Sequence, residues 1–186
     1  MNLSKSVSAV FNAVCRSYEG QGITRACITT LARELGTLPE VSRIVRGFGS
    51  AKAYATRPMI TLRETKPSIY LLGWREGEFT EVHDHGDCDV GIYVVQGQVT
   101  EDLYACGPVV GDERQCLLAM SRQIGQGQCM TCLPTYVHRM GNLFPEVAAT
   151  LHVYGPSLED MCIYDETPLG TLAFREHWHH EKRPQH

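Results

Sequence analysis

The feature that most constrains this chain is a pair of histidines, His83 and His85, separated by one aspartate. In an extended strand, residues two apart point to the same face, so both imidazoles can reach one metal ion. A third histidine, His138, lies far downstream, where a different strand can bring it to the same place. The pattern predicts a sheet-based fold that binds a metal between its strands, with His83, His85 and His138 as ligands.

Glycine and asparagine residues stand at set distances from these histidines. Five residues separate Gly77 from His83, Gly97 closes the first stretch, and three residues separate His138 from Asn142. This spacing resembles the two motifs of the cupin family, whose members are small double-sheet barrels that hold a metal in their mouth. The resemblance implies a mainly β fold, a cupin double-stranded β-helix or jelly-roll-like barrel, here preceded by N-terminal helices.

One position departs from the usual cupin pattern. Most metal cupins carry a glutamate as fourth ligand, and Val90 occupies the matching position. Three neutral histidines leave the charge of a divalent metal uncompensated and leave coordination positions open for an anionic substrate. Such an all-histidine site resembles that of the thiol dioxygenases, the group that contains cysteine dioxygenase. Asp89 is an alternative fourth ligand if the strand register differs by one residue.

Further segments carry the same resemblance across about residues 55 to 165. They are Ala55-Thr56-Arg57, Trp74-x-Glu76-Gly77, Gln96-Gly97 followed by Glu101, and Thr150-x-His152-x-Tyr154-Gly155-Pro156. The last resembles a Ser-x-His-x-Tyr segment of the family, with threonine in place of serine. It implies that Tyr154 contacts substrate and oxygen, that His152 positions Tyr154, and that Thr150 forms a hydrogen bond to His152.

The resemblance also assigns the substrate carboxylate to Arg57. A guanidinium group presents a planar fork of donors and can bind a carboxylate through two hydrogen bonds. Arg63 is the alternative anchor if the alignment shifts. Related enzymes that act on 3-mercaptopropionate tend to carry glutamine at the position of Arg57, so the arginine favours cysteine as substrate.

The implied activity is iron-dependent oxidation of L-cysteine by O2 to cysteine sulfinic acid. Fe(2+) is expected because the resembling family uses it, although imidazole ligands also suit nickel, manganese, copper and zinc. The partners are then a small thiol and O2. The alternatives are a dioxygenase for 3-mercaptopropionate or another small thiol, a non-catalytic ligand-binding cupin, and a cupin isomerase or decarboxylase, which would more often keep the carboxylate ligand.

A covalent modification found in some family members is not expected here. Those members carry a cysteine at the position of Val90, cross-linked to the active-site tyrosine. Valine cannot form that thioether with Tyr154, and Cys88 lies two residues too early. We expect Cys88 to be an unlinked thiol on a turn.

Composition excludes several classes of function. The chain has 186 residues, and its net charge of -4 offers no basic surface for nucleic acid. The sequence contains no run of 18 apolar residues, so we expect no membrane span. The first residues do not resemble a signal peptide. Eight cysteines in such a chain favour reduced thiols and a cytoplasmic location. A monomer or small homo-oligomer is expected.

We expect one cupin domain over residues 1–186, with a helical cap over about 1–50, a β-barrel over about 55–175 and a polar tail over about 177–186. Val7, Val10, Phe11 and Val14 recur at helical spacing. A second helix is expected to follow Thr24, which would act as its N-cap, and a third is expected to begin at Pro39. Strands are expected at 68–72, 91–95, 98–104 and 147–154. Cys129 and Cys132 form a C-x-x-C sequence that we interpret as two core cysteines on opposite faces of a strand.

Overall fold

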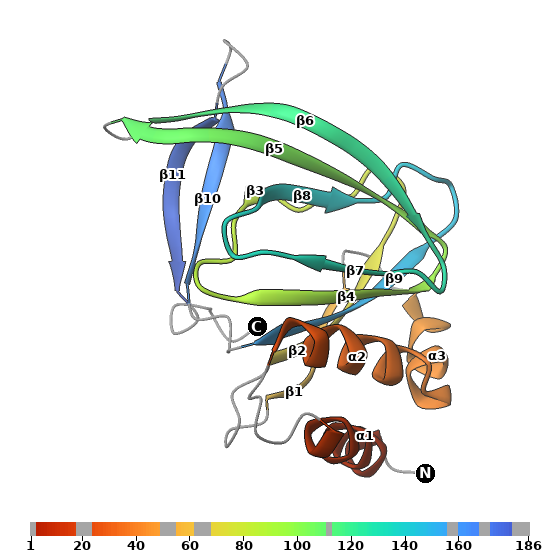
Figure 1. Ribbon diagram of the computed structural model, residues 1–186. Coiled ribbons are helices and arrows are strands. Elements are labelled where there is room, and N and C mark those ends of the chain that lie inside the picture. Colours follow the sequence, from red (N-terminus) through yellow and green to blue (C-terminus); the bar gives the residue numbers. More distant parts are fainter. Residues whose placement is uncertain are drawn as a thin grey trace.

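The computed structural model describes residues 3–17, 24–48, 55–61, 68–110, 113–155, 160–167 and 172–179. Within these ranges the helices come first and the strands follow (Figure 1). The helices are α1 (Leu3–Ser17), α2 (Arg25–Gly36) and α3 (Pro39–Val45). The strands are β1 (Ala55–Thr61), β2 (Ser68–Trp74), β3 (Val82–His83), β4 (Asp89–Gln96), β5 (Gln98–Val110), β6 (Glu113–Gly125), β7 (Cys129–Cys132), β8 (Val137–Gly141), β9 (Ala148–Gly155), β10 (Asp160–Glu166) and β11 (Leu172–His179).

The strands form two antiparallel sheets. The first has the order β1-β2-β9-β4-β7, and the second has the order β10-β11-β6-β5-β8-β3. The second sheet closes on itself because β3 also pairs with β10. The predicted fold class, a mainly β barrel with N-terminal helices, is therefore confirmed.

The helices form where the sequence supplies their start signals. The side chain of Thr24 caps α2 by accepting a hydrogen bond from the backbone N–H of Cys27, and Pro39 stands in the first turn of α3. The apolar faces of the helices pack on the outer face of the first sheet. The backbones of α2 and β4 lie close together at Gly91, where an added Cβ would lie 2.8 Å from the backbone oxygen of Ile28, so the helix can approach the strand there only because Gly91 has no side chain.

Strand β9 is buried on both faces. Leu151 and Val153 join the helix-side cluster, whereas Tyr154 joins a second cluster between the two sheets. This explains why β9 contains almost no polar residues apart from Thr150 and His152, both of which are buried. Of these two residues, His152 lies close enough to the second sheet to interact electrostatically with His83 and His138.

A third cluster lies on the opposite face of the second sheet, inside the ring that β10 and β11 complete. Val82, Val137 and Cys116 are buried there. Cys116 forms a disulfide with Cys106, which stands opposite it in the β5–β6 pair. The expectation that all cysteines are reduced thiols is therefore wrong for this pair, because the hairpin register brings the two side chains together.

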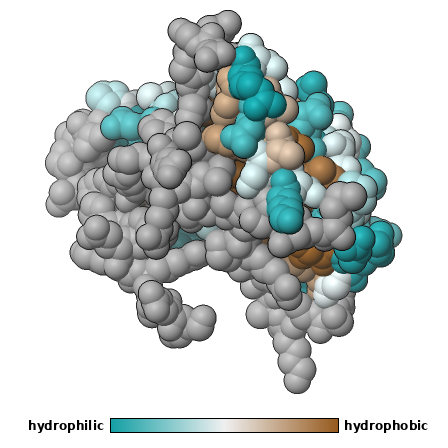
Figure 2. Space-filling view, turned by 90° about the horizontal axis from the view of Figure 1, so that it is seen from below, coloured by the Kyte–Doolittle hydropathy of each residue, from teal (hydrophilic) through white to brown (hydrophobic). Residues whose placement is uncertain are grey.

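The surface that the described residues present on the side seen from below is mixed in character. Seen from below, hydrophilic groups of the described residues are spread among small hydrophobic areas (Figure 2). No helix in the described ranges is long and apolar enough to cross a membrane.

Near the C-terminal end of the described residues, β11 pairs with β10 as far as His179, so the strand includes the first three residues of the stretch expected as a polar tail. His180 and His186 lie outside the described residues.

Candidate metal centre

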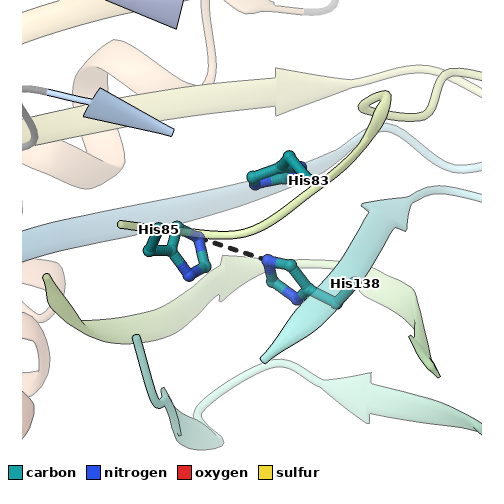
Figure 3. Close-up of side chains that lie close together, drawn as sticks. All are labelled: His83, His85 and His138. Carbon is teal, nitrogen blue, oxygen red and sulfur yellow. Dashed lines mark hydrogen bonds between the residues drawn. The ribbon is translucent and has the colours of Figure 1, made fainter. Parts of the chain in front are cut away.

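Three imidazoles meet on the face of the second sheet that looks toward the first sheet (Figure 3). His83 and His138 stand opposite each other on β3 and β8, and His85 lies two residues after the end of β3. The ring centroids are 5.0 Å apart for His83 and His85 and 4.8 Å apart for each of the other two pairs. One nitrogen from each ring lies within 4.8 Å of the others. The residues predicted as metal ligands are thus brought together by the fold.

The spacing of the nitrogens fits a shared ion. Nε2 of His85 lies 3.3 Å from Nε2 of His138. Two nitrogens at this separation, each about 2.1 Å from one metal, subtend an angle of about 104° at the metal, between the octahedral and tetrahedral values. Nδ1 of His83 is 2.8 Å from the carbonyl oxygen of Glu81, so it acts as the donor and leaves Nε2 as the ligand atom.

Asp84, between the two histidines, points away from the centre and fixes the turn. Its carboxylate accepts hydrogen bonds from the backbone N–H groups of Gly86 and Cys162 and from the hydroxyl of Tyr164, at 3.2, 2.9 and 2.8 Å. These bonds tie the segment after β3 to β10. Because Asp84 is held on one face, its neighbours His83 and His85 are presented on the other.

Two of the candidate ligands, His83 and His85, are held in the neutral form that a metal requires. Burial, followed by the proximity of His138, lowers the pKa of His83 to about 4. The same two causes lower the pKa of His85 well below its usual value. Burial also lowers the pKa of His152 to about 3. These rings therefore keep their lone pairs available at neutral pH.

Glu101, on β5, is a site residue whose role is not evident from the sequence pattern. It is fully buried, and its Oε1 lies 2.8 Å from Nδ1 of His138. Its Oε2 accepts from Nε of Arg122 at 2.6 Å. Burial alone would raise the pKa of Glu101, but the hydrogen bond and charge of His138 and the charge of Arg122 outweigh it and lower the pKa. A buried carboxylate is thus fixed directly behind one candidate ligand.

A chain of hydrogen bonds runs along the facing sheet. The indole N–H of Trp74 donates to Oγ1 of Thr150 at 2.8 Å, and Oγ1 lies 2.8 Å from Nε2 of His152. Nδ1 of His152 lies 3.3 Å from the hydroxyl of Tyr154, whose ring is 6.0 Å from that of His85. The fold thus brings together the three residues of the Thr-x-His-x-Tyr segment and adds the indole N–H donor of Trp74, which the sequence pattern does not reveal.

Val90 and its neighbours take different directions. Val90 is fully buried in the cluster between the sheets, together with Tyr154. Asp89, the alternative ligand, instead faces α2 and forms an ion pair with Arg25 at 3.2 Å. It is absent from the groups of described residues that could hold a metal, so the alternative is wrong. Cys88 follows the turn after His85, is buried and takes no part in a disulfide.

Asn142 and Gly77, two further motif positions, serve the frame around the site. The side-chain amide of Asn142 donates to the carbonyl oxygens of Trp74 and Glu146, and its Oδ1 accepts from Phe144. Gly77 has a φ of +79°, and its N–H donates to the carbonyl of Asn142. These residues join the loops that flank β2 and β8.

The proposed carboxylate anchor is described only through its backbone. Arg57 pairs with Leu71 in the β1–β2 register, and Leu71 lies in the helix-side cluster. The side chain of Arg57 and all of Arg63 lie outside the described residues. Cys129 and Cys132 do point to opposite faces, as predicted: the thiol of Cys129 donates to the carbonyl of Thr29 on α2, whereas Cys132 contacts Glu101.

A two-sheet barrel with three histidines facing its interior defines a cupin with a candidate metal centre. The sequence model of the family described as "Cysteine dioxygenase type I" matches residues 50–167. The chain therefore belongs to the cysteine dioxygenase type I family. Its strand architecture and the spacing of its histidines agree with that membership, which supports a metal cofactor.

Individual relatives agree with the family. The chain is 26% identical over 113 residues to "Cysteine dioxygenase type 1" of Bos taurus, covering 60% of this chain and 56% of the relative. The values are the same for the proteins of that name from Rattus norvegicus and Homo sapiens. The chain spans about half the length of the curated relatives it matches.

Solved structures show weaker likeness. An uncharacterized protein with a double-stranded β-helix domain from Klebsiella pneumoniae aligns with a TM-score of 0.49 at 15% identity, covering 68% of this chain and 94% of the other. A Lactobacillus farciminis oxalate decarboxylase formate complex aligns with a TM-score of 0.46 at 17% identity, covering 58% and 30%.

Proposed function

We propose that this chain is an iron-dependent thiol dioxygenase that oxidises L-cysteine with O2 to cysteine sulfinic acid. The observation that carries the proposal is the position of Tyr154, which faces the three-histidine group from the opposite sheet at a ring separation of 6.0 Å from His85. Family membership supports the same class of reaction. The choice of L-cysteine rests on the names of the relatives and on Arg57.

His83, His85 and His138 are the proposed metal ligands, and their neutral imidazoles fit a divalent ion. Fe(2+) bound there would supply the binding and activation of the thiolate and of O2. We choose iron because the sequence resembles thiol dioxygenases, which use it. The three protein ligands leave further coordination positions for the substrate.

The remaining residues orient the substrate. In this proposal Arg57 binds the carboxylate through its guanidinium fork, although the pairing of its backbone with Leu71 of the helix-side cluster counts against this role. The hydroxyl of Tyr154 donates a hydrogen bond to the reacting groups. His152 holds that hydroxyl, Thr150 holds His152, and the indole N–H of Trp74 fixes the far end of the chain. The buried apolar residues around Tyr154, Val90 among them, exclude water from the reacting atoms.

A cytoplasmic location is part of the proposal, although the Cys106–Cys116 disulfide counts against the argument from reduced thiols. The oligomeric state, a monomer or small homo-oligomer, also stays a prediction.

The test is O2 uptake by iron-loaded protein with cysteine, 3-mercaptopropionate and cysteamine, with sulfinate products identified by mass. We expect uptake that depends on iron and is fastest with cysteine, and none from His138→Ala. Fully iron-loaded protein that consumes no O2 with any thiol would overturn the proposal and favour a ligand-binding cupin.

A further inference from the structure

The three candidate ligands differ in what their second ring nitrogen contacts. Nδ1 of His83 lies 2.8 Å from a backbone carbonyl, that of Glu81. Nδ1 of His138 lies 2.8 Å from a carboxylate oxygen of Glu101. Nδ1 of His85 is buried and has no hydrogen-bond partner among the described residues. The three imidazoles are therefore chemically unequal, and among the described residues only the Nδ1 atom of His138 contacts a carboxylate.

Glu101 is held in place from several directions. It is 0% exposed, and both Nε and an Nη of Arg122 contact its Oε2, at 2.6 and 2.5 Å. Its Oε1 accepts a hydrogen bond from the thiol of Cys132 at 3.5 Å and also contacts Nδ1 of His138. Arg122 comes from β6 of the same sheet and Cys132 from β7 of the first sheet, so strands of both sheets fix the carboxylate before any ligand binds.

We propose that Glu101 is a positioning residue that fixes the Nδ1–H tautomer of His138 and supplies, from behind this ligand, the negative charge that Val90 cannot supply. A carboxylate acceptor selects the tautomer whose Nε2 lone pair faces the metal, and it makes the imidazole a stronger donor. The inference rests on the metal site of the proposed function.

The position of the charge has a chemical consequence. A glutamate at position 90 would occupy a coordination position, as it does in most cupins. Glu101 acts through His138 and occupies none, so it compensates part of the metal charge and leaves the open positions for substrate. The site can thus hold a metal whose charge is partly compensated and still be open to substrate.

The variant Glu101→Gln tests this directly. The two donors of Arg122 require an oxygen at the Oε2 position, so the amide NH2 group is turned toward His138. That NH2 group donates to Nδ1 and favours the Nε2–H tautomer, which cannot bind a metal through Nε2.

A matched control lies one residue away. Asp102 is also buried and pairs with Arg139 of β8 at 2.8 Å, but it lies on the opposite face of β5. Asp102→Asn therefore removes a buried carboxylate of the same sheet without touching His138.

Two measurements apply to both variants and to the wild type. The first is the tautomer of His138 in metal-free protein, read from ¹⁵N chemical shifts of the imidazole. The second is the affinity for Zn²⁺ and Co²⁺ alone, measured by competition with a chelator. We expect Nδ1–H in the wild type and in Asp102→Asn, Nε2–H in Glu101→Gln, and metal affinity about 10- to 100-fold lower in Glu101→Gln alone.

The outcomes separate the two proposals. A wild-type His138 in the Nε2–H form overturns the inference even if Glu101→Gln does not fold. Equal metal affinities in Glu101→Gln and Asp102→Asn overturn it as well. Wild-type protein that binds neither ion, with His138 in the expected tautomer, contradicts the proposed metal site and not the tautomer assignment.

Discussion

Val90 and Tyr154 stand directly opposite each other on the neighbouring antiparallel strands β4 and β9. Opposite residues in such a pair have their side chains on the same face, with Cβ atoms roughly 5 Å apart. A cysteine at position 90 could reach the tyrosine ring, and valine has no atom able to form the thioether. We therefore predict that Tyr154 remains an unmodified phenol, which peptide mapping by mass spectrometry will test. A species two hydrogens lighter that links Tyr154 to Cys88 would contradict this register.

Removal of any one of the three histidines should release the metal. His83→Ala, His85→Ala and His138→Ala each leave two imidazoles of the three that meet at the centre. We expect each variant to lose most bound iron and nearly all thiol oxidation, measured by metal analysis after gel filtration and by O2 uptake. His152→Ala is the matched control for removal of a buried histidine, and it should keep its iron. Full iron occupancy in all three ligand variants would refute the assignment.

Arg57 should set the preference for substrates with a carboxylate. Cysteamine keeps the thiol and amine of cysteine but lacks the carboxylate. Its kcat/KM should therefore be roughly thirtyfold lower, which corresponds to a loss of about 2 kcal/mol of transition-state stabilisation. Arg57→Gln should remove much of that difference and narrow the gap between cysteine and 3-mercaptopropionate. The check is kcat/KM for the three thiols. Arg63→Gln is the matched control, and if it alone removes the preference, Arg63 is the anchor.

Thr150 connects Trp74 to His152, and its hydroxyl group makes both hydrogen bonds. Thr150→Val keeps the shape but removes a hydrogen-bond partner from two buried groups. We expect a loss of about 1–3 kcal/mol in the free energy of unfolding and a fall in kcat that exceeds any change in KM. Thr150→Ser keeps the hydroxyl and should behave nearly as the wild type. Equal kinetics for the valine and serine variants would show that the hydrogen-bond chain has no role in the reaction.

Metal-free protein should become less stable in mild acid. The pKa of His83 falls from about 6.5 in the unfolded chain to about 4 in the folded protein. Below pH 6.5 the unfolded state binds a proton that the folded state does not, so the free energy of unfolding falls by up to about 1.4 kcal/mol per pH unit for this residue. Above pH 6.5 the effect vanishes. Urea unfolding of chelator-treated protein between pH 7.5 and 5 will test it, with His83→Gln expected to show a shallower slope.

The sequence predicted those features that depend on local pattern. The helix cap at Thr24, the helix starting at Pro39 and the shared face of Thr150, His152 and Tyr154 all follow from short-range spacing, and all are present. The proximity of His83 and His138 was predicted from a family motif, because that motif reflects a long-range pairing of strands.

Other features depend on cross-strand register, which spacing does not reveal. Glu101 pairs with Met140 and reaches His138 diagonally, so its acidic character alone gave no sign of its contact. Cys106 and Cys116 meet because of the hairpin register of β5 and β6, whereas their oxidation was judged from composition. The extent of β11 was missed because its sequence ends in a polar, histidine-rich stretch.

Strand β9 has one further consequence, for laboratory evolution. The strand that carries His152 and Tyr154 rests through Leu151 and Val153 on the apolar face of α2. A change in volume at Ile28 or Leu31 will shift β9 and, with it, the phenol hydroxyl. Libraries directed at this helix should therefore change thiol selectivity without altering a single residue that lines the reaction chamber.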